Sequence, residues 1–393
     1  IILVCILILF FAIGNHVFAG RCKISHDMSG KLIIVTGASS GLGKYTALEL
    51  VEKGAKVIFA CRNEEKTRNI FNEISMENRH LAIFEKIDLS SFKSVIDFTR
   101  RVKQKYEKID ILMNNAGNAP DNFRITEDGF ESCIEGNFLG HVVLTYLLID
   151  HMNTNGRIIN LSSIGHNYCF FDEDIMEKIY DNNYVLNHYF SNIFKMNFLY
   201  HTTKLMMIYF TQELNEYFDK RNIPLKTVSL HPGVVNTEFM RFYKNQLWSK
   251  IIFTIFYPIF VLCTKTTKEG SQTQLYLSYL DYSELASGRY YADCKFEKIS
   301  KTAQNTLLGK EFMNYTINKI CEVMKSNYGN YVIQKAIKLA KGEHKQKLVF
   351  NAAKDINKLN EPKLIKKWKL ILSPNIKELS NEQLKYLEEQ NFF

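Results

Sequence analysis

The 393-residue sequence is poor in the features that mark disordered, fibrous or disulfide-bonded proteins. It contains only 6 Pro and 19 Gly, and 46% of its residues are hydrophobic, which is a globular composition. Its eight cysteines are scattered, with no C-x-x-C pair and no neighbouring run of histidines. We therefore expect no metal site, no disulfide framework and a reducing compartment.

Two apolar segments are each shorter than the roughly 20 residues that a membrane-spanning helix needs. They are residues 1–14 and residues 251–263, and Pro258 interrupts the second. The region 1–20 is either a hydrophobic anchor or a signal peptide that is cut near Val17 and Ala19. We favour an anchor, because basic residues follow it.

The chain also lacks an even charge distribution. Lys and Arg exceed Asp and Glu by 50 to 41, and residues 301–393 alone hold 17 lysines against 9 acidic residues. Such a tail can attract nucleic acid or anionic membrane, but a solvated lysine-rich helical surface explains it as well. We expect a large domain at 28–300 and a basic helical tail at 301–393.

Short β-branched runs alternate with longer helical patterns through the region 28–300. The expected strands are 32–35, 57–60, 81–87, 111–113, 157–161, 226–230 and 289–292. This alternation predicts an α/β fold with a Rossmann-type, doubly wound parallel sheet, between an N-terminal hydrophobic segment and an α-helical C-terminal tail. Ligands bind such sheets outside the carboxyl ends of the strands.

A glycine-rich turn follows the first expected strand and opens a helix. Its glycines permit a tight turn and close backbone approach, so that the helix N-terminus can receive a pyrophosphate. The candidate cofactor-binding residues of this turn are Gly37, Ser39, Ser40, Gly41, Leu42, Gly43 and Lys44. An ordinary loop is the alternative interpretation.

The second expected strand ends without an acidic side chain that could bind a ribose 2′-hydroxyl. Arg62 stands there instead, and Lys44 follows the glycine turn. Two bases suit a 2′-phosphate. The sequence therefore favours NADP(H) over NAD(H), although each base could be an ordinary surface charge.

Further motifs follow the turn in a fixed order. They are T-G-A-S-S-G-L-G at 36–43, A-C-R-N at 60–63, D-L-S at 88–90, N-N-A-G at 114–117, G-N-F-L-G-H at 136–141, R-I-I-N-L-S-S at 157–163, Y-H-T-T-K at 200–204 and H-P-G-V-V-N-T at 231–237. Together they resemble the short-chain dehydrogenase/reductase family and, within it, the membrane-associated retinol dehydrogenase-like branch. The resemblance spans roughly residues 28 to 300.

The Tyr-x-x-x-Lys spacing alone does not identify a catalytic pair, because it begins at Tyr200, Tyr291, Tyr315 and Tyr331. Only Tyr200 lies between the strand ends near residues 163 and 232, where a helix can present it to the cofactor crevice. Residues four apart share one helix face. The adjacent ammonium of Lys204 is expected to lower the pKa of the Tyr200 phenol, which is otherwise about 10.

The resemblance implies a role for each catalytic candidate. Tyr200 exchanges the proton, Lys204 also binds the nicotinamide ribose, Ser163 orients the substrate oxygen, and Asn137 supports a proton relay through water. Two alternatives stay open: Ser162 is the active serine and Ser163 a capping residue, or Asn137 merely braces a helix.

The resemblance implies further cofactor contacts. Asp88, Asn115, Ala116 and Gly117 would line the adenosine side, and Pro232, Gly233 and Thr237 would border the nicotinamide carboxamide. The glycines could instead only shape turns.

Two segments bear on the substrate. The stretch between Ser163 and Tyr200 is longer than is usual in the family, so it either reshapes the substrate mouth or forms an inert loop. Segment 251–263 would suit a lid over a lipophilic alcohol or carbonyl, such as a retinoid, steroid or fatty aldehyde, or it could be buried against the sheet. We expect a membrane-associated enzyme, at the endoplasmic reticulum with its catalytic domain facing the cytosol.

A stretch at about 318–360 resembles one Pumilio-type repeat, a unit that reads single RNA bases. Asn330 and Gln334 fall at the base-edge positions, and Tyr331 falls at the stacking position. One repeat is expected to bind RNA poorly, because such repeats are stable only when stacked. RNA binding beside a vestigial or scaffold dehydrogenase domain is therefore the alternative function.

Overall fold

The computed structural model describes residues 20–235, 264–323, 346, 349, 350, 353, 365, 369, 372, 376 and 379–389. The predicted hydrophobic segment up to residue 19, segment 251–263, Thr237 and most of the Pumilio-like stretch lie outside the described residues.

An eight-stranded sheet forms the centre of the domain, in the order β3-β2-β1-β4-β5-β6-β7-β8. Its strands are β1 Leu32–Thr36, β2 Lys56–Cys61, β3 Ala82–Lys86, β4 Ile109–Asn114, β5 Met152–Leu161, β6 Lys226–Leu230, β7 Tyr290–Ala292 and β8 Lys295–Phe296. All neighbours pair in parallel except β7 and β8. The strand order reverses between β1 and β4, which is where such sheets bind ligands.

The predicted fold class and the seven predicted strands are confirmed, and β5 begins five residues earlier than expected. The antiparallel strand β8 is not anticipated by the sequence. It has two residues, both exposed, so it carries no alternation of apolar and polar side chains.

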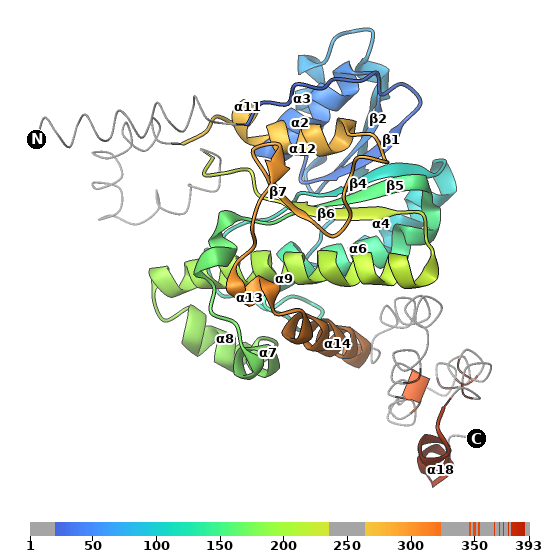
Figure 1. Ribbon diagram of the computed structural model, residues 1–393, viewed down its shortest axis with the longest axis vertical. Coiled ribbons are helices and arrows are strands. Elements are labelled where there is room, and N and C mark those ends of the chain that lie inside the picture. The colour runs from blue at the N-terminus through green and yellow to red at the C-terminus, as the bar shows by residue number, and fades with distance from the viewer. Residues whose placement is uncertain are drawn as a thin grey trace, which may run out of the picture.

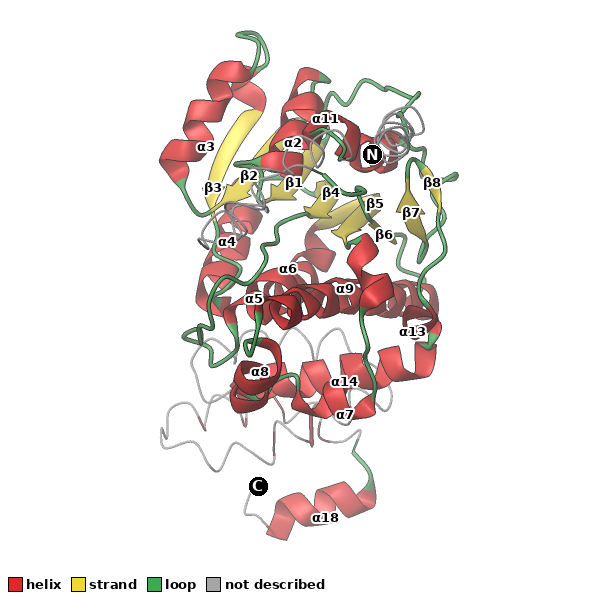
Figure 2. Ribbon diagram, turned by 90° about the vertical axis from the view of Figure 1, so that its left-hand side faces the viewer, coloured by secondary structure: helices red, strands yellow, loops and turns green. Residues whose placement is uncertain are grey.

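Helices cover both faces of the sheet (Figure 1). They are α2 Gly41–Glu52, α3 Glu64–Ile70, α4 Phe92–Lys105, α5 Ser132–Ile134, α6 Gly140–Leu148, α7 Glu173–Lys178, α8 Asn182–Tyr189, α9 Ile193–Arg221, α11 Thr267–Gly270, α12 Gln272–Tyr279, α13 Lys301–Gln304, α14 Thr306–Glu322 and α18 Asn381–Glu389. Figure 2 shows α4, α6 and α9 on the face opposite α2 and α11. Successive residues of β1 alternate between two apolar clusters, one for each face.

The longest helix, α9, carries both Tyr200 and Lys204. The Asn192 side chain caps its start by accepting from the Lys195 amide, as favoured N-cap residues do. It ends at Asn222 in the left-handed region at φ +52°, a conformation that Asn tolerates well. Its 29 residues hold the predicted catalytic pair on a well-anchored element.

The insertion between Ser163 and Tyr200 folds into a 3₁₀ turn at Ile164–Tyr168 followed by α7 and α8. It is a packed part of the domain rather than a surface loop, because Ile179, Val185 and Tyr189 are buried in the core. Helix α14 packs over α7 and α9. The Phe312 ring meets the rings of Phe138, Phe171, Tyr180 and Tyr209.

One continuous helical stretch of the described residues, Ser132–His151, is long and apolar enough to cross a membrane by length and composition. It comprises α5, a π-helical segment at Glu135–Leu139, α6 and a final 3₁₀ turn. Of its most apolar window, 83% is buried inside the protein. Its apolar side chains therefore pack in the hydrophobic core of the domain.

Candidate active site

The glycine turn packs tightly against the end of β4. Gly37 and Gly41 have φ angles of +69° and +56°, which side chains seldom adopt. A Cβ on Gly37 would lie 2.9 Å from the Cα of Ala116, and one on Gly43 would collide with the Asn115 side chain. The backbone therefore forms a cradle that any side chain at these glycines would fill.

The first turn of α2 opens from this cradle. Ser40 is the N-cap, but its side chain makes no capping hydrogen bond. Leu42 packs against Gly270 of α11. A Cβ on Gly270 would lie 2.8 Å from Cδ2 of Leu42. An uncapped helix start is suited to an anion such as a pyrophosphate.

The Asn115 side chain fastens the end of β4 to the glycine turn. Its Nδ2 donates to the Thr36 carbonyl at 2.8 Å, and its Oδ1 accepts from Gln274 Nε2 at 2.9 Å. Gln274 of α12 also accepts from Thr46 of α2. Sequence reasoning missed Gln274, because it lies outside every motif and only the fold brings it here.

The two bases expected at a 2′-phosphate differ in their surroundings. Arg62 is exposed at the end of β2, whereas Lys44 Nζ lies 2.7 Å from Glu73 Oε1. This exposed ion pair contributes little to stability. Arg62 is therefore the stronger candidate for an incoming phosphate.

The other predicted cofactor residues also follow strand ends. Ser39 lies beside the Cys61 thiol at the end of β2, and burial raises the pKa of that thiol. After β3, the Asp88 carboxylate accepts from the Ser90 amide at 3.0 Å.

Pro232 and Gly233 come after β6, and Gly233 has a φ of +88°. A Cβ on Gly233 would lie 2.9 Å from Lys265 Nζ, which forms an ion pair with Asp293. Lys265 and Asp293 were not anticipated by the sequence, because neither belongs to a motif.

Ser163, Tyr200 and Lys204 come together at the carboxyl end of β5. A side-chain hydrogen bond joins the Ser163 hydroxyl to the Tyr200 phenol. Lys204 Nζ donates to the Leu161 carbonyl at 2.9 Å and lies 5.5 Å from the centre of the Tyr200 ring. The predicted pair thus shares one face of α9.

The adjacent serines have different partners. The Ser162 hydroxyl is buried and donates to the Lys204 carbonyl at 2.7 Å, so it braces the backbone of α9. The Ser163 hydroxyl also accepts from the Gly165 amide at 3.1 Å. The Ser163 hydroxyl therefore both caps the 3₁₀ turn that follows it and contacts the Tyr200 phenol.

Burial dominates the electrostatics of the pair. It raises the pKa of Tyr200, although the Ser163 hydrogen bond acts in the opposite direction. It lowers the pKa of Lys204 to about 8. The expected lowering of the phenol pKa by Lys204 does not appear, because desolvation of the phenolate outweighs other effects.

Asn137 lies in the π-helical segment Glu135–Leu139, a geometry that is frequent at functional sites. Its Oδ1 accepts from the Asn118 amide at 3.0 Å, and its Nδ2 donates to the Asn118 carbonyl at 2.9 Å. A Cβ on Gly117 would lie 3.0 Å from Lys204 Nζ and 3.5 Å from Asn137 Oδ1. Asn137 therefore borders the same space as Lys204.

Cys133 is a neighbour that sequence reasoning did not single out. Its Sγ accepts from Asn137 Nδ2 at 3.2 Å. Burial raises the pKa of its thiol well above the usual value. It is thus a neutral packing partner of Asn137 rather than a nucleophile.

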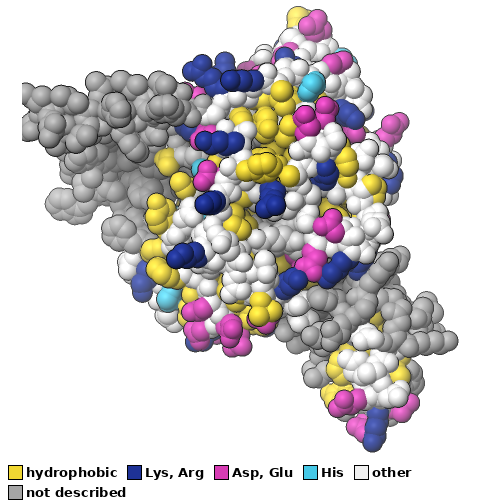
Figure 3. Space-filling model, viewed as in Figure 1, with side chains coloured by type: hydrophobic (Ala, Val, Ile, Leu, Met, Phe, Trp, Pro, Cys, Tyr) yellow, Lys and Arg dark blue, Asp and Glu magenta, His cyan; other side chains and the backbone are white. Residues whose placement is uncertain are grey.

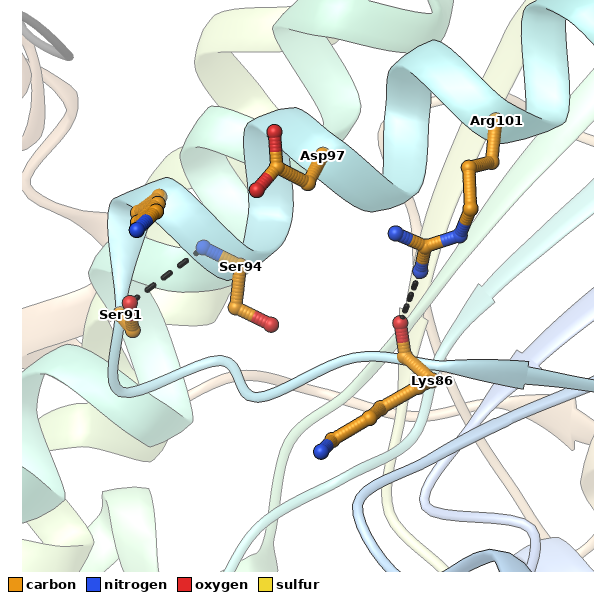
Figure 4. A pocket seen from close by; sticks show the side chains of 6 residues that line it. Lys86, Ser91, Ser94, Asp97 and Arg101 are labelled. Carbon is orange, nitrogen blue, oxygen red and sulfur yellow. Dashed lines mark hydrogen bonds between the residues drawn. The ribbon is translucent and has the colours of Figure 1, made fainter.

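A surface depression of about 250 Å³ lies elsewhere, between the end of β3 and α4 (Figure 4). It is lined by Lys86, Ser91, Lys93, Ser94, Asp97 and Arg101. The Arg101 guanidinium donates to the Lys86 carbonyl, and none of the lining residues is a predicted site residue.

With this sheet and its glycine cradle, the chain belongs to the short-chain dehydrogenase/reductase family. Residues 31–171 match the family described as short chain dehydrogenase. The chain is 31% identical to human retinol dehydrogenase 12 over 310 residues, which cover 78% of this chain and 90% of that protein. It is 35% identical to human retinol dehydrogenase 13 over 284 residues, or 72% and 82% of the two chains.

Solved structures share the fold. A short chain dehydrogenase from Salmonella enterica matches with a TM-score of 0.51 at 20% identity, over 69% of this chain and 99% of that one. Residues 319–350 match the Pumilio-family RNA binding repeat. Both resemblances predicted from the sequence are confirmed, and family membership makes the chain an oxidoreductase of a nicotinamide-binding fold.

Proposed function

We propose that the protein is an NADP(H)-dependent oxidoreductase that interconverts a lipophilic alcohol and its aldehyde or ketone, with Tyr200 as the general acid and base. The observation that carries this proposal is the hydrogen bond between the Ser163 hydroxyl and the Tyr200 phenol, beside the buried Lys204. The substrate class is that of a retinoid, steroid or fatty aldehyde.

The chain's own residues fit the cofactor. The turn at Gly37, Gly41 and Gly43 would hold the pyrophosphate, Arg62 the 2′-phosphate, and Lys204 the nicotinamide ribose. Ser39, Ser40, Leu42, Lys44, Asp88, Asn115, Ala116, Gly117, Pro232, Gly233 and Thr237 complete the proposed cofactor contacts. When bound, the nicotinamide supplies or accepts the hydride.

Tyr200 and its neighbours transfer the proton to and from the substrate oxygen. Because burial raises the pKa of Tyr200, its phenol is protonated at neutral pH and can donate to a substrate carbonyl oxygen. Ser163 orients that oxygen from the same side. Lys204 offsets the negative charge that develops on the phenol, and Asn137 supports the return of a proton from water.

Exposed aromatic side chains on the insertion after Ser163 and on α9 support a lipophilic substrate. Tyr168 and Phe170 are 62% and 83% exposed on the insertion after Ser163. The rings of Tyr168 and Phe198 flank His201, with centroids 6.3 and 5.9 Å from its own. Retinol is named as the substrate in the relatives' names.

The proposed location is a membrane, at the endoplasmic reticulum with the catalytic domain in the cytosol. The apolar composition of residues 1–14 and the basic residues Arg21 and Lys23 support it. The lipophilic substrate class is consistent with such a location.

A panel of retinal, steroid ketones, long-chain aldehydes and small polar carbonyls, assayed with NADPH and NADH in parallel, tests this function. We expect NADPH-dependent reduction of the lipophilic members. Tyr200→Phe should abolish it, since the ring stays but the proton is lost. Turnover of small polar carbonyls alone would contradict the substrate class.

The adjacent serines provide a matched control. We expect Ser163→Ala to lower kcat by about 100-fold or more, the effect of losing a positioned proton-transfer partner. Ser162→Ala should mainly lower the melting temperature, because that hydroxyl binds backbone. The reverse result would identify Ser162 as the active serine.

The match of residues 319–350 to a Pumilio repeat favours RNA binding as the second candidate function. On the face in Figure 3, basic and acidic side chains are interspersed rather than gathered in one basic stripe. Retention of a uridine-rich strand by the full chain tests this function. Salt-sensitive retention that Tyr331→Ala weakens and Tyr200→Phe leaves intact would support RNA binding.

A further inference from the structure

His141 lies fully buried between the cofactor turn and Asn137. It belongs to α6, within the motif that includes Asn137. Its Nδ1 is 3.1 Å from the Asn137 carbonyl oxygen, and its Nε2 is 3.0 Å from Thr36 Oγ1. One ring therefore contacts two segments about 100 residues apart in the chain.

The positions of the hydrogens in this chain of contacts follow from its chemistry. A backbone carbonyl only accepts, so His141 Nδ1 must carry the hydrogen that binds Asn137. Burial lowers the pKa of His141 to about 3, so the ring is neutral and Nε2 keeps a lone pair. The Thr36 hydroxyl therefore donates to Nε2, which is nearer than the Met113 carbonyl at 3.3 Å.

Thr36 extends these contacts to the end of β4. Its Oγ1 accepts from the backbone amides of Asn115 at 2.9 Å and of Ala116 at 3.0 Å. Thr36 also directly precedes Gly37, the first residue of the cradle. Ordered hydrogen bonds thus run from the proposed cofactor site through Thr36 and His141 to Asn137.

Asn137 extends these contacts to the catalytic helix. Its Nδ2 lies 3.3 Å from Thr203 Oγ1, one residue before Lys204. Its carbonyl belongs to the π-helical segment, where the ladder of backbone bonds is irregular. A side-chain donor at this carbonyl restricts how the segment can move.

We propose that His141 is a positioning residue that holds the cofactor turn and Asn137 in one fixed relative placement. The proposal rests on the proposed function of Asn137 and of the turn. Neutral imidazole suits this role, because its two nitrogens point in different directions, one donating and one accepting. Loss of the hydrogen bond to Thr36 should affect NADPH binding, and loss of the hydrogen bond to Asn137 should affect kcat.

Two isosteric variants separate the two bonds. In His141→Asn, the amide nitrogen takes the place of Nδ1, so the Asn137 bond is kept and the Thr36 bond is lost. In His141→Gln, the amide oxygen takes the place of Nε2, so the Thr36 bond is kept and the Asn137 bond is lost.

We expect His141→Asn to raise the dissociation constant for NADPH by about tenfold while kcat changes less than about threefold. His141→Gln should lower kcat by about tenfold and leave the dissociation constant within about threefold. The control variant is His151→Asn. His151 is half-buried and also forms a hydrogen bond with a backbone carbonyl, that of Tyr106. This variant should change neither the dissociation constant for NADPH nor kcat. Equal losses of both quantities in both variants, or no loss, would overturn the proposal.

The dissociation constant is measured by NADPH fluorescence, so it does not depend on turnover. If no carbonyl is reduced by the wild type, the proposed function fails, yet the difference in NADPH binding between the two variants still tests His141.

Nitrogen-15 spectra of labelled histidine test the arrangement itself in the wild-type chain. The His141 signal, assigned by its loss in either variant, should show a neutral ring with its proton on Nδ1 from about pH 5 to 9. A proton on Nε2, or titration near pH 6.5, would contradict the network even if a variant folds poorly.

Discussion

At the scale of single residues, the site depends on how burial changes two ionisable groups in opposite directions. Burial raises the pKa of Tyr200 and lowers that of Lys204 to about 8. Both shifts have the same cause, since desolvation disfavours the charged form of either group. At neutral pH the phenol therefore holds its proton while Lys204 still carries charge, a combination that suits proton donation to a carbonyl.

The reduction rate should consequently fall as the pH rises through about 8. Above its pKa of about 8, Lys204 loses the charge that stabilises the developing phenolate, so log kcat should drop by up to about one unit per pH unit. Measurement of kcat for a lipophilic aldehyde across this range with saturating NADPH checks it.

Lys295→Met provides the control, because Lys295 is the exposed lysine of another Tyr-x-x-x-Lys match. It should leave the pH profile unchanged. A wild-type rate that stays constant up to pH 10 would exclude Lys204 as the titrating group.

At the scale of elements, α14 joins the C-terminal region to the catalytic domain. Phe312 is fully buried among aromatic rings from the π-helical segment, the insertion and α9. The Tyr180 hydroxyl lies 2.7 Å from Thr316 Oγ1, and the Tyr315 hydroxyl donates to the Glu177 carbonyl at 2.8 Å. The boundary proposed at residue 300 therefore precedes two helices that pack on the reductase.

Phe312→Ala should lower the free energy of unfolding by about 3–5 kcal/mol, since a large buried ring leaves a cavity. Leu307 lies on the same helix but is 66% exposed, and Leu307→Ala should change stability by less than about 0.5 kcal/mol. Urea denaturation of both variants gives the comparison. Equal, small effects would mean that α14 is dispensable for the fold.

At the scale of the whole molecule, buried neutral histidines make the fold sensitive to acid. Burial lowers the pKa of His141 to about 3 and that of His231 to about 4. Unfolded histidine binds a proton near pH 6.5, so the unfolded state gains protons first as the pH falls. Their contribution is present above pH 6.5 and is lost progressively below it.

Each of these two histidines should therefore reduce the free energy of unfolding by about 2 kcal/mol between pH 7 and pH 5. In His231→Asn, the new amide oxygen can still accept from the Gly233 amide. The decrease in the free energy of unfolding between pH 7 and pH 5 should therefore be about 2 kcal/mol smaller in this variant than in the wild type. The exposed His26 is the control, and His26→Asn should behave as wild type. Urea unfolding at the two pH values measures the difference, and an unchanged loss in His231→Asn would contradict the assignment.

The sequence by itself determined seven of the eight strands, the glycine turn and the family of this protein. Alternation of β-branched and helical patterns is local, as is the need for glycine at the positive φ angles of Gly37 and Gly41. These signals lie within short windows of the chain. They therefore place Tyr200 after Ser163 and predict that both face the cofactor crevice.

Only the tertiary structure decided which neighbouring side chains meet at the site. Ser162 and Ser163 are adjacent residues of the same type. The Ser162 hydroxyl nevertheless contacts the α9 backbone, whereas the Ser163 hydroxyl contacts Tyr200. The bridge of His141 between Thr36 and Asn137 was equally invisible in the sequence. The physical reason is that hydrogen bonds and burial depend on segments far apart in the chain, and no local period records which of them pack together.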